Sequence, residues 1–233
     1  MTATGEPLFG IPRGDALRGN LILSCAFGAY FWIVYWTGNY VAAHSARAHV
    51  ALPFESAMPF VPWTIVLYLT ITPLLCLAPF LFRTPDRMLP LFATMVVEVT
   101  IAGVVFCLYP VELSFPPQDV SPAEGFLVWL ASMAALQYNC VPSLHVALAA
   151  TAGWAYLKVG GPRWRFFVCA WVAAIVVSTL LGHQHHLVDL AAGAVLTWIA
   201  IVVVPPRILK LQRDRSRRRT GLTPLGAESG KTT

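Results

Sequence analysis

The sequence predicts an all-α protein that crosses a membrane six times. Of its 233 residues, 57% are hydrophobic and only 12% are charged, whereas a soluble domain usually carries about 25% charged residues. The mean hydropathy is +0.66. Because charge is scarce over most of the chain, the composition excludes both a water-soluble globule and a disordered protein.

Six apolar stretches are long enough to cross a bilayer, for which about 17 to 20 residues are needed. They are residues 21–43, 62–82, 88–109, 142–158, 166–183 and 186–204. A seventh stretch, 126–138, is too short, and Pro142 disfavours helix at the residue before it; we interpret this stretch as an interfacial or re-entrant helix. We expect one six-helix domain over residues 1–206, followed by a basic, disordered cytoplasmic tail over 207–233.

The Lys and Arg residues predict the orientation of these spans, because they favour the cytoplasmic side. Of the sixteen, all but Arg47 lie in the N-terminal segment, the second and fourth loops or the tail. The long third loop has no basic residue at all. We therefore expect an integral protein of the cell (inner) membrane with both termini in the cytoplasm. Loops 44–61, 110–141 and 184–185 then face the outer, periplasmic or lumenal side.

Two polar clusters lie at the outer ends of the predicted spans, where polar groups are costly and usually mark function. The first is Asn-Cys-Val-Pro-Ser-Leu-His over residues 139–145. The second, over residues 178–189, begins with Ser-Thr and includes His-Gln-His-His before Asp189. Both clusters belong to the same face of the membrane in the predicted topology.

The spacing within the second cluster predicts a catalytic pair. His185 and Asp189 are four residues apart and share one face of a helix that begins at or just before His185. A carboxylate there accepts the proton of one imidazole nitrogen and leaves the other free to attack an electrophile. His145, at the start of another helix, is then available as a general acid. Solvated interfacial histidines with a helix-capping aspartate are the structural alternative.

The two clusters resemble motifs of the type 2 phosphatidic acid phosphatase superfamily. Residues 142–145, Pro-Ser-Leu-His, are similar to its Pro-Ser-Gly-His motif. Ser178-Thr179, five residues, His185, three residues, Asp189 follows the spacing of its Ser-Arg, His and Asp motif. The resemblance implies the superfamily's six-helix fold, a phosphohistidine on His185 supported by Asp189, and His145 as the acid.

The departures from the superfamily pattern favour one branch. The early motif of Lys, six residues and Arg-Pro is not found before Pro142, Thr179 replaces Arg, and Leu144 replaces Gly. This combination is more similar to the inositol phosphorylceramide synthase branch, whose members move a phospho-alcohol head group between lipids. A phosphomonoester carries nearly two charges and is usually bound by Arg or Lys. The missing cations therefore favour a singly charged lipid phosphodiester, although they also fit a weakly active enzyme.

The resulting prediction is an integral-membrane phosphotransferase acting on lipid phosphodiester head groups, with a lipid alcohol or water as acceptor and without cofactor or metal. The amino ends of spans four and six would help to bind the phosphate. The predicted substrate contacts are Asn139, Ser143, Ser178, Thr179, His183 and Gln184.

Three other functions remain open from the sequence. The first alternative is a lipid phosphate or diphosphate phosphatase of the same superfamily. A metal-binding membrane protein would use His145, His183, His185, His186 and Asp189 as ligands. A transporter is less favoured because only Glu98 and Asp189 are charged within the spans. No nucleic-acid reader motif accompanies the basic tail.

Overall fold

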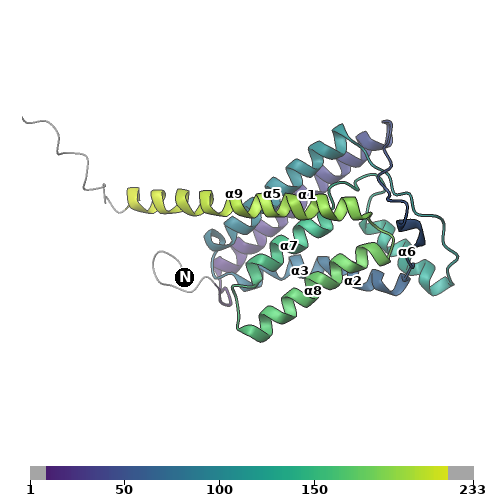
Figure 1. The fold of residues 1–233 in the computed structure, drawn as a ribbon. Coiled ribbons are helices and arrows are strands. Elements are labelled where there is room, and N and C mark those ends of the chain that lie inside the picture. Colours follow the sequence, from purple (N-terminus) through teal and green to yellow (C-terminus); the bar gives the residue numbers. More distant parts are fainter. Residues whose placement is uncertain (1–8, 220–233) are drawn as a thin grey trace, which may run out of the picture.

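The computed structural model describes residues 9–219, which form a bundle of helices and no strands (Figure 1). The longer helices are α1 (Asp15–Ala43), α5 (Pro85–Leu108), α6 (Pro122–Ala134), α7 (Leu144–Tyr156), α8 (Pro162–Leu181) and α9 (Leu187–Arg219). Shorter elements fill the region between α1 and α5: η1 (Glu55–Ala57), η2 (Pro62–Thr64), α2 (Ile65–Leu69), α3 (Ile71–Cys76) and α4 (Ala78–Leu81). The all-helical class is as predicted.

Among the described residues, four helices are long and apolar enough to cross a membrane: α1, α5, α8 and α9. The structure therefore supports four of the six predicted spans and does not confirm the other two. The two that fall short are 62–82, which is divided into short helices, and 142–158, which yields only the thirteen-residue α7. At 1.5 Å per residue, α7 is about 20 Å long, less than the roughly 30 Å of a hydrocarbon core.

Prolines explain why residues 62–82 do not form one helix. Pro73 lies within α3, and Pro79 lies within α4. Each lacks the N–H that would bond to the residue four positions earlier, and its ring clashes with that carbonyl. The sequence predicted one continuous span here, but the segment is divided at Thr70 and Leu77, where one short helix meets the next.

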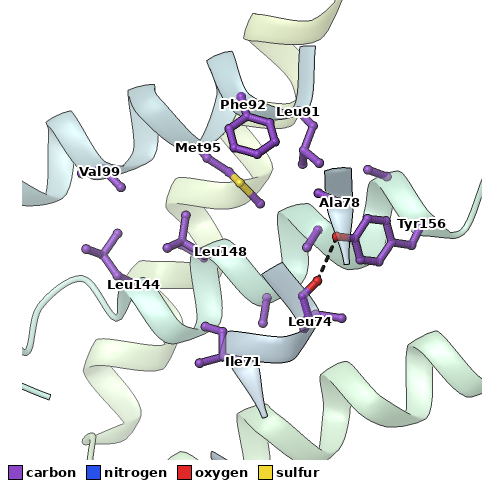
Figure 2. Close-up of a cluster of buried hydrophobic side chains, with 14 of the residues drawn as sticks. Ile71, Leu74, Ala78, Leu91, Phe92, Met95, Val99, Leu144, Leu148 and Tyr156 are labelled. Atoms are coloured by element: carbon purple, nitrogen blue, oxygen red, sulfur yellow. Dashed lines mark hydrogen bonds between the residues drawn. The ribbon is translucent and has the colours of Figure 1, made fainter. Parts of the chain in front are cut away.

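Helix α7 forms the centre of the bundle. Ten of its thirteen residues are buried, and it packs against α3, α5, α8 and α9. In Figure 2, Leu144 and Leu148 of α7 lie beside Met95 and Val99 of α5. Tyr156, at the end of α7, donates a hydrogen bond of 2.9 Å to the carbonyl of Leu74 in α3, and this bond fixes the short helices against the bundle. Because neighbouring helices surround α7, it needs no lipid-facing surface.

Two hydrogen bonds tie α7 to its neighbours within the apolar interior. The hydroxyl of Thr151 donates to Glu98 of α5 over 2.5 Å. The hydroxyl of Thr197 in α9 donates to the carbonyl of Ala147 over 3.1 Å. Interhelical hydrogen bonds of this kind commonly stabilise helix packing in membrane proteins. Glu98 is thereby engaged in helix packing.

The two ends of the bundle differ in charge. Arg13, Arg83 and Arg87 line one cavity beside the start of α1 and α5, and the turn that holds Lys158 and joins α7 to α8 lies at the same end (Figure 1). The loops that follow α1 and α5, helix α6 and the turn between α8 and α9 lie at the opposite end (Figure 1). This segregation is the one that the loop charges predict.

Two predicted boundaries change. The short apolar stretch predicted over 126–138 is α6, which starts four residues earlier because Glu124 accepts hydrogen bonds from the backbone N–H and hydroxyl of Ser121. The tail predicted to be disordered from residue 207 is instead helical to Arg219, as a continuation of α9 beyond the bundle (Figure 1). Gln212 in this extension donates to the carbonyl of Asp86 over 2.6 Å. Residues 220–233 of the predicted tail lie outside the described residues.

Candidate active site

The two motifs meet where α7 and α9 begin. The backbone N–H of Ser143 donates to the carbonyl of Asp189 over 3.0 Å. Ser143 itself caps α7, since its hydroxyl accepts from the N–H of Val146. Gly193, one turn further along α9, faces the carbonyl of Ser143, and a Cβ placed on it would lie 2.6 Å from that oxygen. The close approach of the two helices therefore requires glycine at this position.

His185 and Asp189 form a buried pair, as their spacing predicts. Nδ1 of His185 lies 3.2 Å from Oδ2 of Asp189, and the two side chains are 7% and 0% exposed. A carboxylate oxygen accepts, so Nδ1 carries the proton and Nε2 keeps its lone pair. The backbone N–H of His186 donates to the same Oδ2 over 2.9 Å. Asp189 is therefore held from two sides, and His185 presents a free nitrogen.

His145 lies beside this pair, in the first turn of α7. Its ring centroid is 5.7 Å from that of His185. Tyr68 of α2 stacks on the other side of His145, with centroids 4.1 Å apart and planes 20° apart. The Tyr68 hydroxyl is 3.5 Å from Nδ1 of His145, too long for a strong hydrogen bond. Tyr68 holds the imidazole plane mainly by stacking.

Sequence reasoning missed Tyr68. It precedes His145 by 77 positions and lies in the segment that the sequence predicts to be a featureless span. A tyrosine in an apolar segment is usually read as an interface anchor, so the sequence carries no signal for this contact.

The turn between α8 and α9 is organised by Thr179. Its carbonyl accepts from the backbone N–H groups of both Gln184 and His185. The hydroxyls of Ser178 and Thr179 donate to carbonyls of their own helix, those of Ile175 and Val176. The Gln184 amide donates to the carbonyl of Gly182. These predicted substrate contacts serve, in this structure, to shape the turn that carries His185.

A cavity of about 320 Å³ reaches this site. One wall follows α1 from Tyr35 back to Ser24, and the facing wall is formed by Ile71 and its neighbours in α2, α3 and α4. Tyr35 and Ser24 are eleven residue steps apart, which makes the α1 wall about 16 Å long at 1.5 Å per step. Apolar side chains dominate the lining, and Asn139, His145 and His185 are among its polar side chains. Of the predicted site residues, these three line the cavity, with Asp189 behind His185.

The cavity opens on the side of the bundle. Trp32 of α1 and Cys76 of α3 both belong to its lining and are exposed. Asn139 lies near the other end of the cavity; its Nδ2 donates to the carbonyl of Tyr35 over 2.7 Å, and its Oδ1 is buried without a partner among the described residues. Ser143, Ser178, Thr179, His183 and Gln184 are not part of the lining.

His183 and His186 enclose Phe115, which lies in the loop between α5 and α6. The Phe115 ring stacks on His183 at 4.1 Å and on His186 at 4.4 Å. Nε2 of His183 lies 3.3 Å from the carbonyl of Met58. Burial lowers the pKa of His183; the hydrogen bond to Met58 opposes this effect, and nearby His186 adds to it. His183 is therefore neutral. The backbone of His183 is also unusual, because its φ of +50° lies in the left-handed region that few residues other than glycine adopt.

The five side chains required by the metal-binding alternative have other partners. His186 bonds to Glu55, His183 faces Met58, and His185 faces Asp189. Within residues 9–219, no three His, Cys, Asp or Glu side chains are placed to hold a metal ion together. The geometry gives a histidine–carboxylate pair with a second histidine beside it.

Among the described residues of the loops at this end of the bundle, Arg47 is the one Lys or Arg. Its Nε donates to Glu112 over 2.5 Å, and its guanidinium covers the ring of Tyr138. Arg47 is therefore already engaged. The start of α9 is engaged too, because the N–H groups of His186 and Leu187 bond to Asp189 and Glu55. The start of α7 is partly engaged by its own Ser143 cap, and its first two residues, Leu144 and His145, line the cavity.

Fold and site together define a helical membrane protein with a buried histidine–carboxylate pair and a second histidine at the end of an apolar cavity. A family model described as the PAP2 superfamily matches residues 36–203. Since this match covers most of the chain, the protein belongs to the PAP2 superfamily, the type 2 phosphatidic acid phosphatases that the motifs resemble. No curated protein matches the chain. Members of the superfamily are phosphatases and phosphotransferases.

Proposed function

We propose that this protein is an integral-membrane phosphotransferase that transfers lipid phosphodiester head groups through a phosphohistidine on His185. The observation that carries the proposal is the apolar cavity that ends at His145 and His185. A lipid needs an apolar site for its chains and a reactive group where its phosphate lies, and this cavity supplies both.

The proposed reaction has two displacement steps at phosphorus. Nε2 of His185 attacks phosphorus, the bond from phosphorus to the departing alcohol oxygen breaks, and protonated His145 gives its proton to that oxygen. An acceptor hydroxyl then attacks the phosphohistidine, neutral His145 takes the acceptor's proton, and the phosphorus–nitrogen bond breaks. Asp189 keeps the proton on Nδ1 and stabilises the positive charge that develops on the His185 ring.

The scarcity of cations supports a diester over a monoester. Phosphoryl transfer depends on stabilising the charge on the non-bridging oxygens. Arg47 is already paired with Glu112, and the first amides of α9 are occupied. A singly charged diester requires less compensation than a doubly charged monoester. Hydrolysis of a lipid phosphate or diphosphate, with water as acceptor, is the second candidate, because the same three side chains support it.

The position of the site supports a reaction at the outer membrane face. The site lies at the end of the bundle opposite the arginines that line the cavity beside α1 and α5, and basic ends favour the cytoplasm. We propose that the substrate is a phospholipid of the outer leaflet and that both termini are cytoplasmic.

The decisive experiment is turnover by the purified full-length protein in lipid nanodiscs. Phospholipids with a labelled head group would be offered with and without a lipid alcohol, in parallel with a labelled lipid phosphomonoester. We expect a new phospholipid that forms only with the lipid alcohol and is lost in Asp189→Asn. Release of inorganic phosphate from the monoester, with no head-group transfer, would instead establish the phosphatase. Absence of both products would overturn the proposal.

A further inference from the structure

Glu55 is a buried acid in the loop between α1 and η2. It is the first residue of the short helix η1 and is 1% exposed. An acid so deeply buried is costly unless hydrogen bonds surround it. Glu55 lies 130 positions before His185 in the chain, and neither motif predicts its place beside them.

Three donors surround the Glu55 carboxylate. The N–H of Leu187, the first residue of α9, donates to Oε1 over 2.6 Å. The N–H of Leu52 donates to Oε2 over 3.0 Å. Nδ1 of His186 lies 2.7 Å from the same Oε2. The side chain thus caps α9 from outside the helix, where a negative group also complements the helix dipole.

The hydrogen bond at Nε2 of His186 shows which of its two ring nitrogens carries the proton. The N–H of Ser114 donates to Nε2 over 3.2 Å, so Nε2 carries a lone pair and the ring proton lies on Nδ1, facing Glu55. Phe115 stacks on the same ring. His186 is therefore a neutral connector between two outer loops, and its side chain is not free to bind substrate.

The backbone of His186 connects this network to the proposed catalytic pair. Its N–H donates to Oδ2 of Asp189, the oxygen that also faces Nδ1 of His185. Glu55 holds the side chain of His186 and the next backbone N–H, that of Leu187. The orientation of the first turn of α9, and with it the place of Oδ2, thus depends on a carboxylate from a different loop.

We propose that Glu55 is a positioning residue for phosphoryl transfer. By binding His186 and the N–H of Leu187, it keeps Oδ2 of Asp189 within hydrogen-bonding distance of Nδ1 of His185. This inference rests on the proposed roles of His185 and Asp189. A misplacement of a catalytic group by about 1 Å lowers turnover by about a hundredfold, and loss of the Glu55 contacts acts on the backbone that carries Asp189.

Glu55→Gln removes the charge and places an amide where three donors need acceptors. Glu112→Gln is the matched control, because Glu112 is also an acid of the outer loops, but its side chain pairs with Arg47 and His49. In nanodiscs, we expect Glu55→Gln to lower kcat about tenfold to a hundredfold, with KM within about twofold of the wild type. Glu112→Gln should keep the wild-type kcat. A folded Glu55→Gln protein with wild-type kcat would overturn the inference.

A second readout requires no turnover. Diethyl pyrocarbonate acylates the imidazole nitrogen that carries a lone pair, and His145 and His185 line the same cavity. The ratio of labelling at His185 to that at His145, measured by peptide mass spectrometry, therefore corrects for access. We expect this ratio to fall severalfold in both Glu55→Gln and Asp189→Asn, because each removes the carboxylate's support for His185. An unchanged ratio in Glu55→Gln would overturn the inference even if the wild type had no phosphotransfer activity.

The variant Glu55→Asp distinguishes a loss of positioning from a loss of stability. It keeps the carboxylate but shortens its reach by one methylene, so we expect an intermediate kcat and an intermediate labelling ratio. If Glu55→Gln failed to fold while Glu55→Asp matched the wild type in both measurements, Glu55 would be needed only for stability, and the positioning role would be rejected.

Discussion

The backbone N–H of Ser143 is bonded to the carbonyl of Asp189, 3.0 Å away. One main-chain hydrogen bond therefore joins the residue that caps α7 to the residue that orients His185. It sets the relative height of the two helix starts and so the separation of His145 from His185. Two motifs separated by a helical hairpin act as one unit because their backbones, as well as their side chains, are in contact.

Replacing Gly193 with Ala should separate these two helices. The added Cβ would lie 2.6 Å from the carbonyl oxygen of Ser143, and a backbone atom cannot rotate away as a side chain can. We expect a loss of about 1–3 kcal/mol in stability, seen as a lower Tm, together with reduced turnover. Gly161→Ala is the control, since nothing lies within 4 Å of the Cβ position at Gly161. Equal Tm values for the two variants would contradict the close approach.

Asp189→Asn should reduce turnover by about 10² to 10⁴ while leaving the bundle folded. The amide cannot hold a proton on Nδ1 of His185 as a carboxylate does, so the wrong ring nitrogen becomes free. Helical circular dichroism and Tm measure folding, and kcat measures the effect on chemistry. Near-normal kcat would exclude the orienting role that we propose for Asp189.

His185→Ala should abolish covalent labelling by a substrate that carries ³²P in its phosphate. The alanine offers no nucleophile, so no phosphohistidine can form. Acid-labile, alkali-stable label on the wild-type protein, mapped to the peptide with His185, is the expected positive result. His44→Ala, which alters an exposed histidine at the end of α1, should keep the label. Label that persists in His185→Ala would show that another residue is the nucleophile.

Gly28→Leu should partly fill the cavity without disturbing the helix. Gly28 lines the cavity, and nothing lies within 4 Å of the position where its Cβ would be; leucine is also a better helix former than glycine. We expect KM to rise severalfold for a long-chain phospholipid and to change little for a short-chain analogue. Equal effects on both substrates would show that the lipid chains lie elsewhere.

Ala123→Cys tests the orientation of the bundle. Ala123 is exposed near the start of α6, and Arg215 is exposed near the end of α9. In a chain whose five native cysteines have been replaced, an impermeant thiol reagent added to intact cells should label Ala123→Cys. Arg215→Cys should react only after permeabilisation. The reverse pattern would place the site in the cytoplasm.

The sequence predicted the long helices because an unbroken apolar run determines them. It predicted the wrong form for residues 62–82 because total hydropathy was weighed above Pro73 and Pro79, which divide the segment. The position of α7 at the centre of the bundle was not predicted. Its apolar residues surround the whole helix, and nothing in such a pattern distinguishes burial against protein from contact with lipid.

The contact between His185 and Asp189 could be predicted from the sequence because the two residues are four positions apart, a spacing that places them on one helix face. Asn139, His145 and His185 line one cavity. Glu55, Tyr68 and Phe115 come from three other segments, and only tertiary packing brings them to the site. Conversely, Ser178 and Thr179 match a motif by spacing, but their hydroxyls are bonded within α8.

The shortness of α7 also determines the order in which the protein can assemble. A helix of thirteen residues is below the length that inserts stably into a bilayer by itself. Of its packing partners, α8 and α9 follow it in the chain, so they are synthesised after it. The packing of α7 against its neighbours is therefore complete only after these later helices have been synthesised. The candidate site likewise requires α9, the last helix of the chain to be synthesised, because this helix supplies the Asp189 carbonyl that binds the N–H of Ser143.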